Sequence, residues 1–409
     1  MREKKFVRIA AFVLCLSMLM GSAALLVSAS EDQVPGGSVT DTSLEELREL
    51  LNAISYEQYS AKHAGVPAAD VAVEVPIDQY VTEDEGFEWL ESGALKTPSN
   101  GSVSWTVEIP KTAKYAIKIE YYPDRNRATS IERILKLNDK VPFAEARFLT
   151  IPKRWENVYI DAILEPAKGQ SAEALMDLAK AAGYTDVRVI KEPAKTDTYK
   201  RYDQPIVVIG FPEYVTQSMS EFADKYGVRF FQRDINDNEL RPVAKDEPDW
   251  MTYYVKDSSG YYTENFEFVL DAGTNKITLE GQNEPLTVKS ITLYPVEKLD
   301  DYATYIKRYA DKPLGKDTVK IEAELPTVLS NKTIYPVEDR SCAINSPTDT
   351  NRSVLNTIGG DKWATAGQWV EYRFRVSTSG MYDIVSRFRQ DVLDGMSSGD
   401  RSCSLPGCT

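Results

Sequence analysis

The chain has 409 residues, of which 42% are hydrophobic, so it is long enough for two or three domains with cores of their own. Acidic residues number 62 and basic residues 48, and this excess of 62 − 48 = 14 negative charges disfavours nucleic acid and anionic membrane surfaces as partners. The four cysteines define neither a disulfide framework nor a metal site by their spacing.

The first 29 residues have the pattern of a secretory signal peptide. Basic residues within the first eight positions precede an apolar run, Ile9 to Val27, and Val27-Ser28-Ala29 supplies the small residues of a cleavage site. We therefore expect cleavage after Ala29 and a secreted or cell-surface mature protein. An uncleaved membrane anchor is the alternative, because the apolar run only just reaches the length of a membrane span.

Residues 30–69 are predicted to be a polar linker followed by an amphipathic helix. Ser43-Leu44-Glu45-Glu46 has the pattern of a capping box, and aliphatic residues recur at helical spacing from Leu44 to about Lys62. His63, the only histidine, follows this segment. At the end of a helix a histidine is more typical of a partner for the helix dipole than of a catalytic base.

Residues 70–297 alternate apolar and polar side chains in short runs, which predicts a β-sandwich module. The expected strands are Val71–Val75, Gly101–Ile109, Tyr115–Tyr122, Ile134–Leu137, Phe266–Leu270, Lys276–Glu280 and Ser290–Tyr294, with a turn at Ala272 to Asn275. An α/β insertion near 160–235 interrupts them. Its expected elements are the helices Ser171–Ala182 and Glu213–Tyr226 and the strands Val187–Ile190 and Ile206–Gly210.

Residues 298–317 are predicted to be a connecting helix, Leu299–Arg308, and a linker. A second β-sandwich module is expected at 318–396, with an opening strand at Thr318–Leu325 and a hairpin at Gln368–Arg389. Strand periodicity ends after this hairpin, and residues 397–409 form an irregular tail. We expect this second module to be incomplete, because its sequence supplies only about half of the strands of a β-sandwich and would leave strand edges unpaired.

The two modules repeat each other. The alternating apolar residues from Val103 to Ile109 match those from Val370 to Val376, and Val73-Glu74-Val75-Pro76 matches Ala323-Glu324-Leu325-Pro326 in order and type. The predicted fold class is therefore mainly β, with two jelly-roll-like β-sandwich domains, the first carrying the α/β insertion and the second incomplete.

The hairpins, the Ile321-Glu322-Ala323-Glu324 segment and the closing segment Phe266 to Pro295 resemble the β-sandwich carbohydrate-binding modules of families 6 and 35. The chain also looks like the region of such modules that precedes the extracellular solute-binding lobe of sugar importers in Firmicutes. This resemblance implies glycan binding without catalysis. It also implies a structural Ca²⁺ ion held by Glu74 in the first module and by Glu322 and Glu324 in the second. Alternatively, these carboxylates simply face solvent from their strands.

Aromatic side chains beside polar ones are candidates for stacking on a sugar ring. They are densest at Asp249 to Tyr254 and at Asp257 to Tyr262, and one more lies in a glycine-rich segment of the second module. The predicted ligand-binding residues are Trp250, Tyr253, Tyr261 and Trp363. Trp105 and Tyr372 follow the buried alternation instead.

Catalysis has little support in the sequence. A single histidine leaves no base for a nucleophilic triad, and no glycine-rich phosphate-binding loop follows the buried strand at Ile206. The leading hypothesis is a secreted, non-catalytic protein that binds a glycan or oligosaccharide. The alternatives are the N-terminal portion of the solute-binding component of an ABC-type sugar importer, with a membrane importer complex as its partner, and the accessory region of a cell-surface glycoside hydrolase.

Overall fold

The computed structural model describes residues 53–125, 130–192, 202–296, 299–341, 345–359 and 362–388. The predicted signal peptide, the capping box at Ser43 and the irregular tail lie outside the described residues. The structure is mainly β, with 13% helix and several antiparallel sheets. Within the described ranges, no helix has both the length and the apolar character needed to cross a bilayer.

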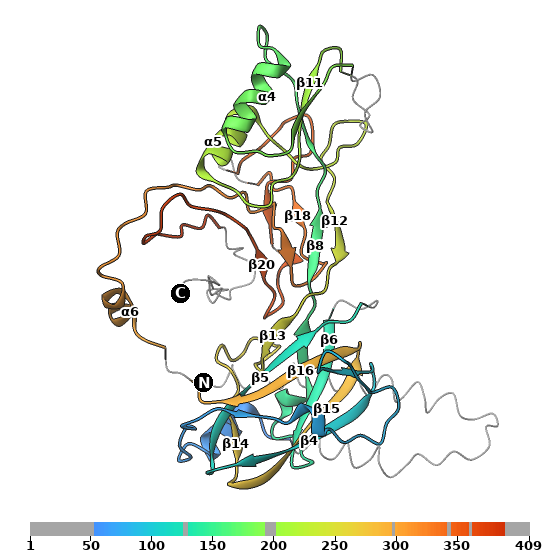
Figure 1. Cartoon of the computed structure of the whole chain (residues 1–409), viewed down its shortest axis with the longest axis vertical. Helices are drawn as coiled ribbons and strands as arrows, with labels where there is room; N and C mark the ends of the chain where they lie inside the picture. Colours follow the sequence, from blue (N-terminus) through green and yellow to red (C-terminus); the bar gives the residue numbers. More distant parts are fainter. Residues whose placement is uncertain are drawn as a thin grey trace, which may run out of the picture. The chain divides into compact units, whose positions relative to one another are not determined.

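Two antiparallel sheets form a β-sandwich (Figure 1). In the larger sheet the main strand order is β13 (Met251–Tyr254), β5 (Ala113–Tyr122), β16 (Leu286–Tyr294), β3 (Leu95–Thr97) and β2 (Glu88–Trp89). Beyond this path, β1 (Val73–Glu74) pairs with β16, and β14 (Phe268–Leu270) pairs with β5. The smaller sheet has the order β4 (Gly101–Ile109), β15 (Gly273–Asn283), β6 (Ser130–Leu137) and β7 (Leu149–Pro152).

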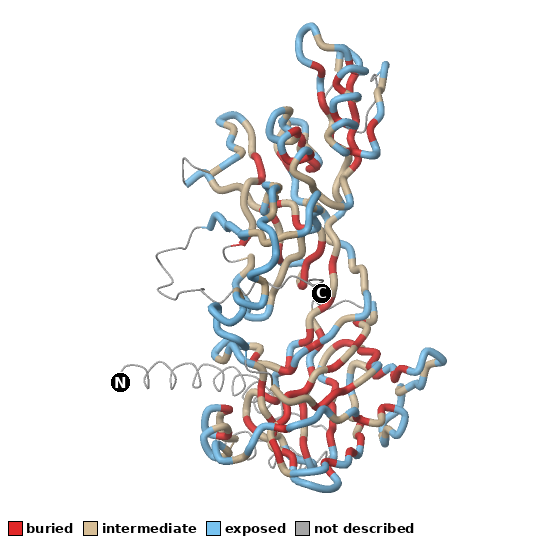
Figure 2. The backbone as a smooth tube through the Cα atoms, turned by 60° about the vertical axis from the view of Figure 1, so that its left-hand side comes forward, coloured by how far each residue is buried: buried red, intermediate tan, exposed pale blue. Residues whose placement is uncertain are grey.

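The core of the sandwich lies between the inner faces of these sheets. Along β4 every second residue from Val103 to Ile109 is buried, and β5 and β16 contribute the buried Ile117, Ile119 and Ile291 to the same core. The buried segments are red in Figure 2. The Trp105 side chain is completely buried, and its indole N–H donates to the Ile77 carbonyl at 3.1 Å, within the short helix η1 (Ile77–Gln79). The predicted strand at Gly101–Ile109 and the buried position of Trp105 are confirmed.

The helix α3 (Tyr56–Lys62) packs on the sandwich core through two tyrosines. Their hydroxyl groups accept backbone hydrogen bonds from β14 and the residue before it, Tyr56 from Glu267 at 3.0 Å and Tyr59 from Val269 at 2.9 Å. Ser55 caps this helix, and His63 ends it with its Nδ1 2.9 Å from the Tyr59 carbonyl. Because residues 53–55 are not helical, the prediction of one continuous helix to Lys62 was wrong there.

The insertion contains a ribbon and a small α/β unit. The ribbon is β8 (Trp155–Val158) paired with β12 (Val243–Asp246), and the unit has the antiparallel order β10 (Val187–Ile190), β11 (Ile206–Ile209) and β9 (Ala162–Leu164). The helices α4 (Ala172–Ala181) and α5 (Gln217–Tyr226) pack on this unit, and Gly227 ends α5 in the left-handed conformation. The predicted insertion is confirmed, and the ribbon is an addition to it. The short helix η2 (Ala144–Arg147) belongs to the sandwich.

Beyond α6 (Tyr302–Arg308), the described residues of the second module form only two-residue strands. β17 (Val328–Leu329) pairs with β8 of the insertion and with β20 (Val370–Glu371), while β18 (Pro336–Val337) pairs with β19 (Thr357–Ile358). Two predictions were therefore wrong, since residues 318–325 form no strand and the hairpin at 368–389 is reduced to β20.

The physical reason is the lack of partners. In the first module β4 is paired along its length with β15, and β5 with β16. The described residues offer the segment after β20 no equivalent strands. It makes isolated bridges instead, from Phe374 to Val215 and from Met381 to Leu314, because a strand without neighbours leaves its backbone groups unpaired.

Candidate functional site

The outer face of the larger sheet carries a row of aromatic side chains. In this sheet Lys118 of β5 lies opposite Tyr254 of β13 on one neighbouring strand and opposite Thr292 of β16 on the other. Since side chains alternate between the two faces of a strand, Trp250 and Tyr254 point away from the core. Their side chains are 40% and 47% exposed. We call this surface, formed by β13, β5 and β16, the outer face.

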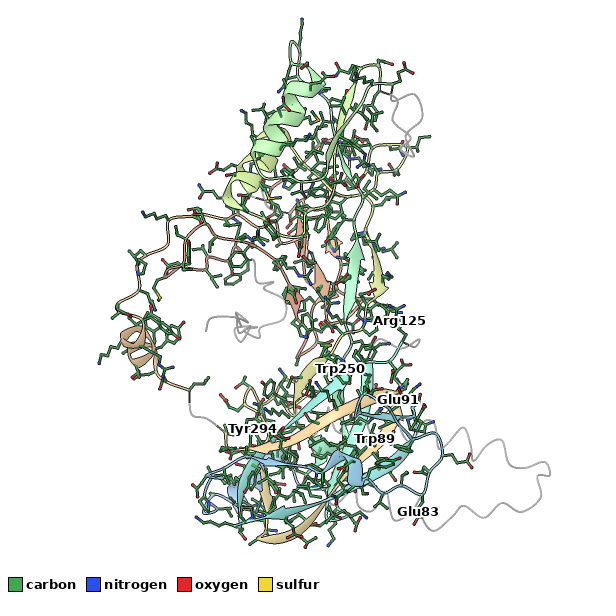
Figure 3. All side chains as sticks on the ribbon, viewed as in Figure 1. Glu83, Trp89, Glu91, Arg125, Trp250 and Tyr294 are labelled. Carbon is green, nitrogen blue, oxygen red and sulfur yellow. The ribbon has the colours of Figure 1, made fainter. Side chains whose placement is uncertain are left out.

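The aromatic residues of the outer face form two pairs. Trp250 and Tyr122 have ring centroids 5.6 Å apart in a tilted arrangement, and Tyr254 and Tyr294 are 6.1 Å apart in an edge-to-face arrangement. Figure 3 shows Trp250 and Tyr294 on this sheet. Aromatic contacts of this kind hold rings in fixed orientations at the surface. The outer face therefore presents preoriented rings to solvent.

A β-bulge places a charged group beside Trp250. The register of β16 shifts between Val288 and Ser290, and the extra residue is Lys289. Its Nζ lies 5.3 Å from the centroid of the Trp250 ring and forms an ion pair of 2.7 Å with the Glu120 Oε1. The Ser290 hydroxyl donates to the other Glu120 oxygen at 3.4 Å. Glu120 thereby fixes the lysine above the indole.

Further polar groups lie at the other end of the outer face. The Asn265 amide donates to the Tyr294 hydroxyl at 3.0 Å, and the Thr292 hydroxyl donates to the Glu74 carboxylate at 2.9 Å. Burial raises the pKa of Tyr294 above its ordinary value. This phenol therefore stays protonated at neutral pH and is available as a hydrogen-bond donor.

These features define what the outer face can do chemically. Rings of Trp and Tyr stack on the C–H faces of a pyranose, and amide, hydroxyl and carboxylate groups beside them hydrogen-bond to sugar hydroxyls. Glu120 and Glu74 are each engaged by a neighbouring side chain, Lys289 and Thr292 respectively. The arrangement suits recognition of a neutral polar ring.

Tyr261 is presented by a structured loop next to this face. The Asp257 side chain is buried and accepts backbone N–H bonds from Ser259 at 2.9 Å, Tyr261 at 2.6 Å and Tyr262 at 3.2 Å. The Tyr261 side chain is 79% exposed. The loop rejoins the sandwich at Asn265, which bonds to Tyr294 of the outer face.

Two other predicted ligand residues do not belong to this surface. The prediction for Tyr253 was wrong, because β13 turns its ring to the core, where only 5% is exposed. Trp363 is half-buried against a small apolar cluster that includes Trp155 and Ile334, and its indole N–H donates to the Gln368 carbonyl at 3.2 Å. Trp250 lies at the Lys289 end of the outer face, whereas the loop of Tyr261 approaches Ala366 at Gly260, so the structure does not bring Trp250, Tyr261 and Trp363 together.

The three carboxylates predicted to bind calcium each have a protein partner. Glu324 is buried and paired with Arg229 at 2.7 Å, Glu322 is paired with Lys320 at 2.7 Å, and Glu74 accepts from Thr292. In the part of the chain that the structure describes, no group of three or more His, Cys, Asp or Glu side chains is arranged to hold a metal ion. Calcium at these residues therefore stays a prediction from the resemblance.

Sequence reasoning missed several members of the outer face, namely Tyr122, Tyr254, Tyr294, Glu120 and Lys289. The alternation along β5 and β13 could have indicated that Tyr122 and Tyr254 face outward. The position of Lys289 depends on a bulge, which leaves no signature in the strand pattern.

The fold and this surface define an antiparallel β-sandwich protein with an exposed aromatic face. No protein-family model and no curated protein matches the chain. Among solved structures, it is similar to a family 35 carbohydrate-binding module from an environmental isolate, with 12% identity over 57% of this chain and 94% of that one and a TM-score of 0.17. It is also similar to the Podospora anserina GH26-CBM35 β-(1,4)-mannanase, with 10% identity over 60% of this chain and 37% of that one and a TM-score of 0.18. TM-scores of this size define neither the fold nor the function of the chain.

Proposed function

We propose that this protein binds a neutral carbohydrate on the outer face and does not cleave it. The observation that carries this proposal is the Trp250 ring, which is 40% exposed although tryptophan is a residue that proteins usually bury. The Tyr122 ring packs against it with 5.6 Å between the centroids, and Trp250 directly precedes β13, which is paired with β5. A rigid exposed ring gains contact area on binding at a low cost in conformational entropy.

The polar groups of the outer face support a sugar as the ligand. Tyr294 and Asn265 lie at one end, and Glu120 and Lys289 lie beside Trp250, so hydrogen-bonding groups flank the aromatic surface at both ends. A purely apolar partner would displace water from these polar groups without replacing its hydrogen bonds. A neutral ring with hydroxyl substituents satisfies both parts of the surface.

The test is a glycan-array screen of the full chain, followed by calorimetric titration of the best glycan. Replacing Trp250 with alanine removes a contact worth about 1.5–3 kcal/mol, so binding should weaken by at least about tenfold. Trp89→Ala is a matched control. Trp89 is 41% exposed in the same sheet but pairs with the buried Leu95, so the register puts it on the other side of the sheet from the outer face. Both tryptophans are labelled in Figure 3.

Secretion and calcium are further parts of the proposal. We expect the mature protein to begin after Ala29 and to be recovered outside the cell, which N-terminal sequencing of the exported protein would establish. Calcium is tested by repeating the glycan titration with a chelator. Weaker binding would support a structural calcium ion, and unchanged binding would remove it from the account.

A further inference from the structure

A cavity lies on the ribbon of β8 and β12, outside the outer face. Its volume is about 110 Å³, several times the roughly 10–15 Å³ that one water requires. Its lining combines Arg241, Lys332 and Tyr335 with the apolar side chains of Ile334 and Ala244. Ile334 is completely buried and belongs to the same apolar cluster as Trp155, so this part of the lining is fixed by packing. β12 and β8 are labelled in Figure 1.

Cations gather around this cavity on aromatic rings. The Arg241 guanidinium carbon lies 4.1 Å from the Tyr335 ring centroid, and the Lys362 Nζ lies 5.7 Å from the same centroid. The Lys332 Nζ lies 5.2 Å from the ring of Trp155. Within the described residues, the side chains of Arg241 and Lys332 form no ion pair or hydrogen bond. Both residues are exposed, each cation lies over one aromatic ring, and no carboxylate among the described residues pairs with either charge.

This local charge is opposite to that of the chain. The protein carries a net charge of −14, and many of its described basic side chains are paired with a carboxylate. The lining of this cavity contains two cations and no acidic residue. Charges of one sign in a concave, partly apolar site attract counter-ions more strongly than the same charges on an open surface.

We propose that this cavity binds a small organic anion. A carboxylate, phosphate or sulfate group of the ligand would bond to the Arg241 guanidinium, whose planar fork matches such oxyanions, and to the Lys332 ammonium. The apolar body of the ligand would rest against Tyr335 and Ala244, which line the cavity and are only partly buried. This site is separate from the outer face, so it does not depend on carbohydrate binding there.

The experiment is calorimetric titration of the full chain, at constant ionic strength, with benzoate, phenyl phosphate and the uncharged benzamide. Saturable binding of benzoate, phenyl phosphate or both is expected, and their comparison distinguishes a carboxylate ligand from a phosphate-like one. Arg241→Gln and Lys332→Gln should each weaken this binding by about ten- to a hundredfold, because each removes a charge-assisted hydrogen bond. Arg241→Lys keeps the charge and should retain part of the affinity.

Arg375→Gln is the matched control. Arg375 also lies over a tyrosine, with its guanidinium carbon 3.8 Å from the Tyr214 ring centroid, but it does not line the cavity. This variant should bind the anions as the unmodified chain does. The proposal is overturned if neither anion binds, if benzamide binds as tightly as benzoate, or if the Arg241 and Lys332 variants bind the anions with unchanged affinity.

Discussion

Arg229 holds two buried carboxylates from different parts of the chain. Its Nε and Nη2 donate to the two Glu239 oxygens at 3.0 and 2.9 Å, and its Nη1 donates to Glu324 at 2.7 Å. Arg229 also donates to the Leu355 carbonyl. The exposed fractions of the side chains are 11% for Arg229, 1% for Glu239 and 2% for Glu324. One guanidinium therefore joins the insertion to the segments around Glu324 and Leu355.

Replacing Arg229 with methionine should destabilise this region strongly. The substitution keeps the length of the side chain but removes the only ion pair of Glu324 in the described residues and the closest one of Glu239, whose remaining partner is Arg233 at 3.9 Å, and this costs about 3–5 kcal/mol. Arg188→Met is the matched control, because Arg188 also pairs with two carboxylates, those of Asp161 and Asp186. That cluster is 41–66% exposed, so its loss should cost no more than about 1 kcal/mol.

The two variants are compared by calorimetric unfolding and by hydrogen exchange of peptides that cover 353–357 and 228–240. Arg229→Met should lower the unfolding temperature and speed exchange in both peptides, since Leu355 also donates its N–H to Glu239 at 2.9 Å. Equal effects of Arg229→Met and Arg188→Met would refute the reasoning, because burial would then make no difference to the value of the ion pairs.

Two further outcomes concern the buried carboxylates of Glu324 and Asp257. Burial raises the pKa of Glu324 to about 7 from 4.5, so the folded state holds this proton more tightly than the unfolded state, and stability should fall as the pH rises from about 4.5 to 7. In a series of unfolding temperatures measured against pH, Glu324→Gln should lack this slope. An identical slope in both proteins would contradict the prediction. Asp257→Ala leaves three backbone N–H groups of the 257–262 loop without their acceptor. Hydrogen exchange in this loop should therefore accelerate, and the free energy of unfolding should drop by about 1–3 kcal/mol. Unchanged protection from exchange would show that the carboxylate does not hold the loop.

The sequence predicted elements well where local chemistry determines them. Ser171 and Gly227 mark a helix start and a helix end by capping, and the structure has them as the N-cap of α4 and the C-cap of α5. The alternation from Gly101 to Ile109 predicted β4 with its buried Trp105 because one face of this strand meets a core.

Elements that depend on distant partners were predicted less well. The repeat of the β4 and β5 pattern after Gln368 suggested a second hairpin, yet alternation specifies only which face would be buried and does not supply neighbouring strands. The predicted turn at Ala272 to Asn275 was wrong for a related reason. β15 begins at Gly273, because pairing with Ile109 on β4 extends the strand through the turn residues.

The candidate site shows the same division. Composition identified the aromatic cluster around Trp250, and the period of two along β13 separates the outward Tyr254 from the inward Tyr253 once the first strand residue is known. The pairing of Tyr254 with Tyr294, and the position of Lys289 beside Trp250, depend on the register between strands far apart in the chain. Register is set by the assembled sheet and by its bulge, which no single segment encodes.

The central claim is that the outer face binds a glycan through Trp250, and one titration tests it directly. The glycan that binds best on the array is titrated into the full chain and into Trp250→Ala and Trp89→Ala. The account predicts that affinity falls at least about tenfold in Trp250→Ala and is unchanged in Trp89→Ala, with all three proteins equally folded. Equal affinity in Trp250→Ala and the unmodified chain, or no glycan bound on the array, would contradict it.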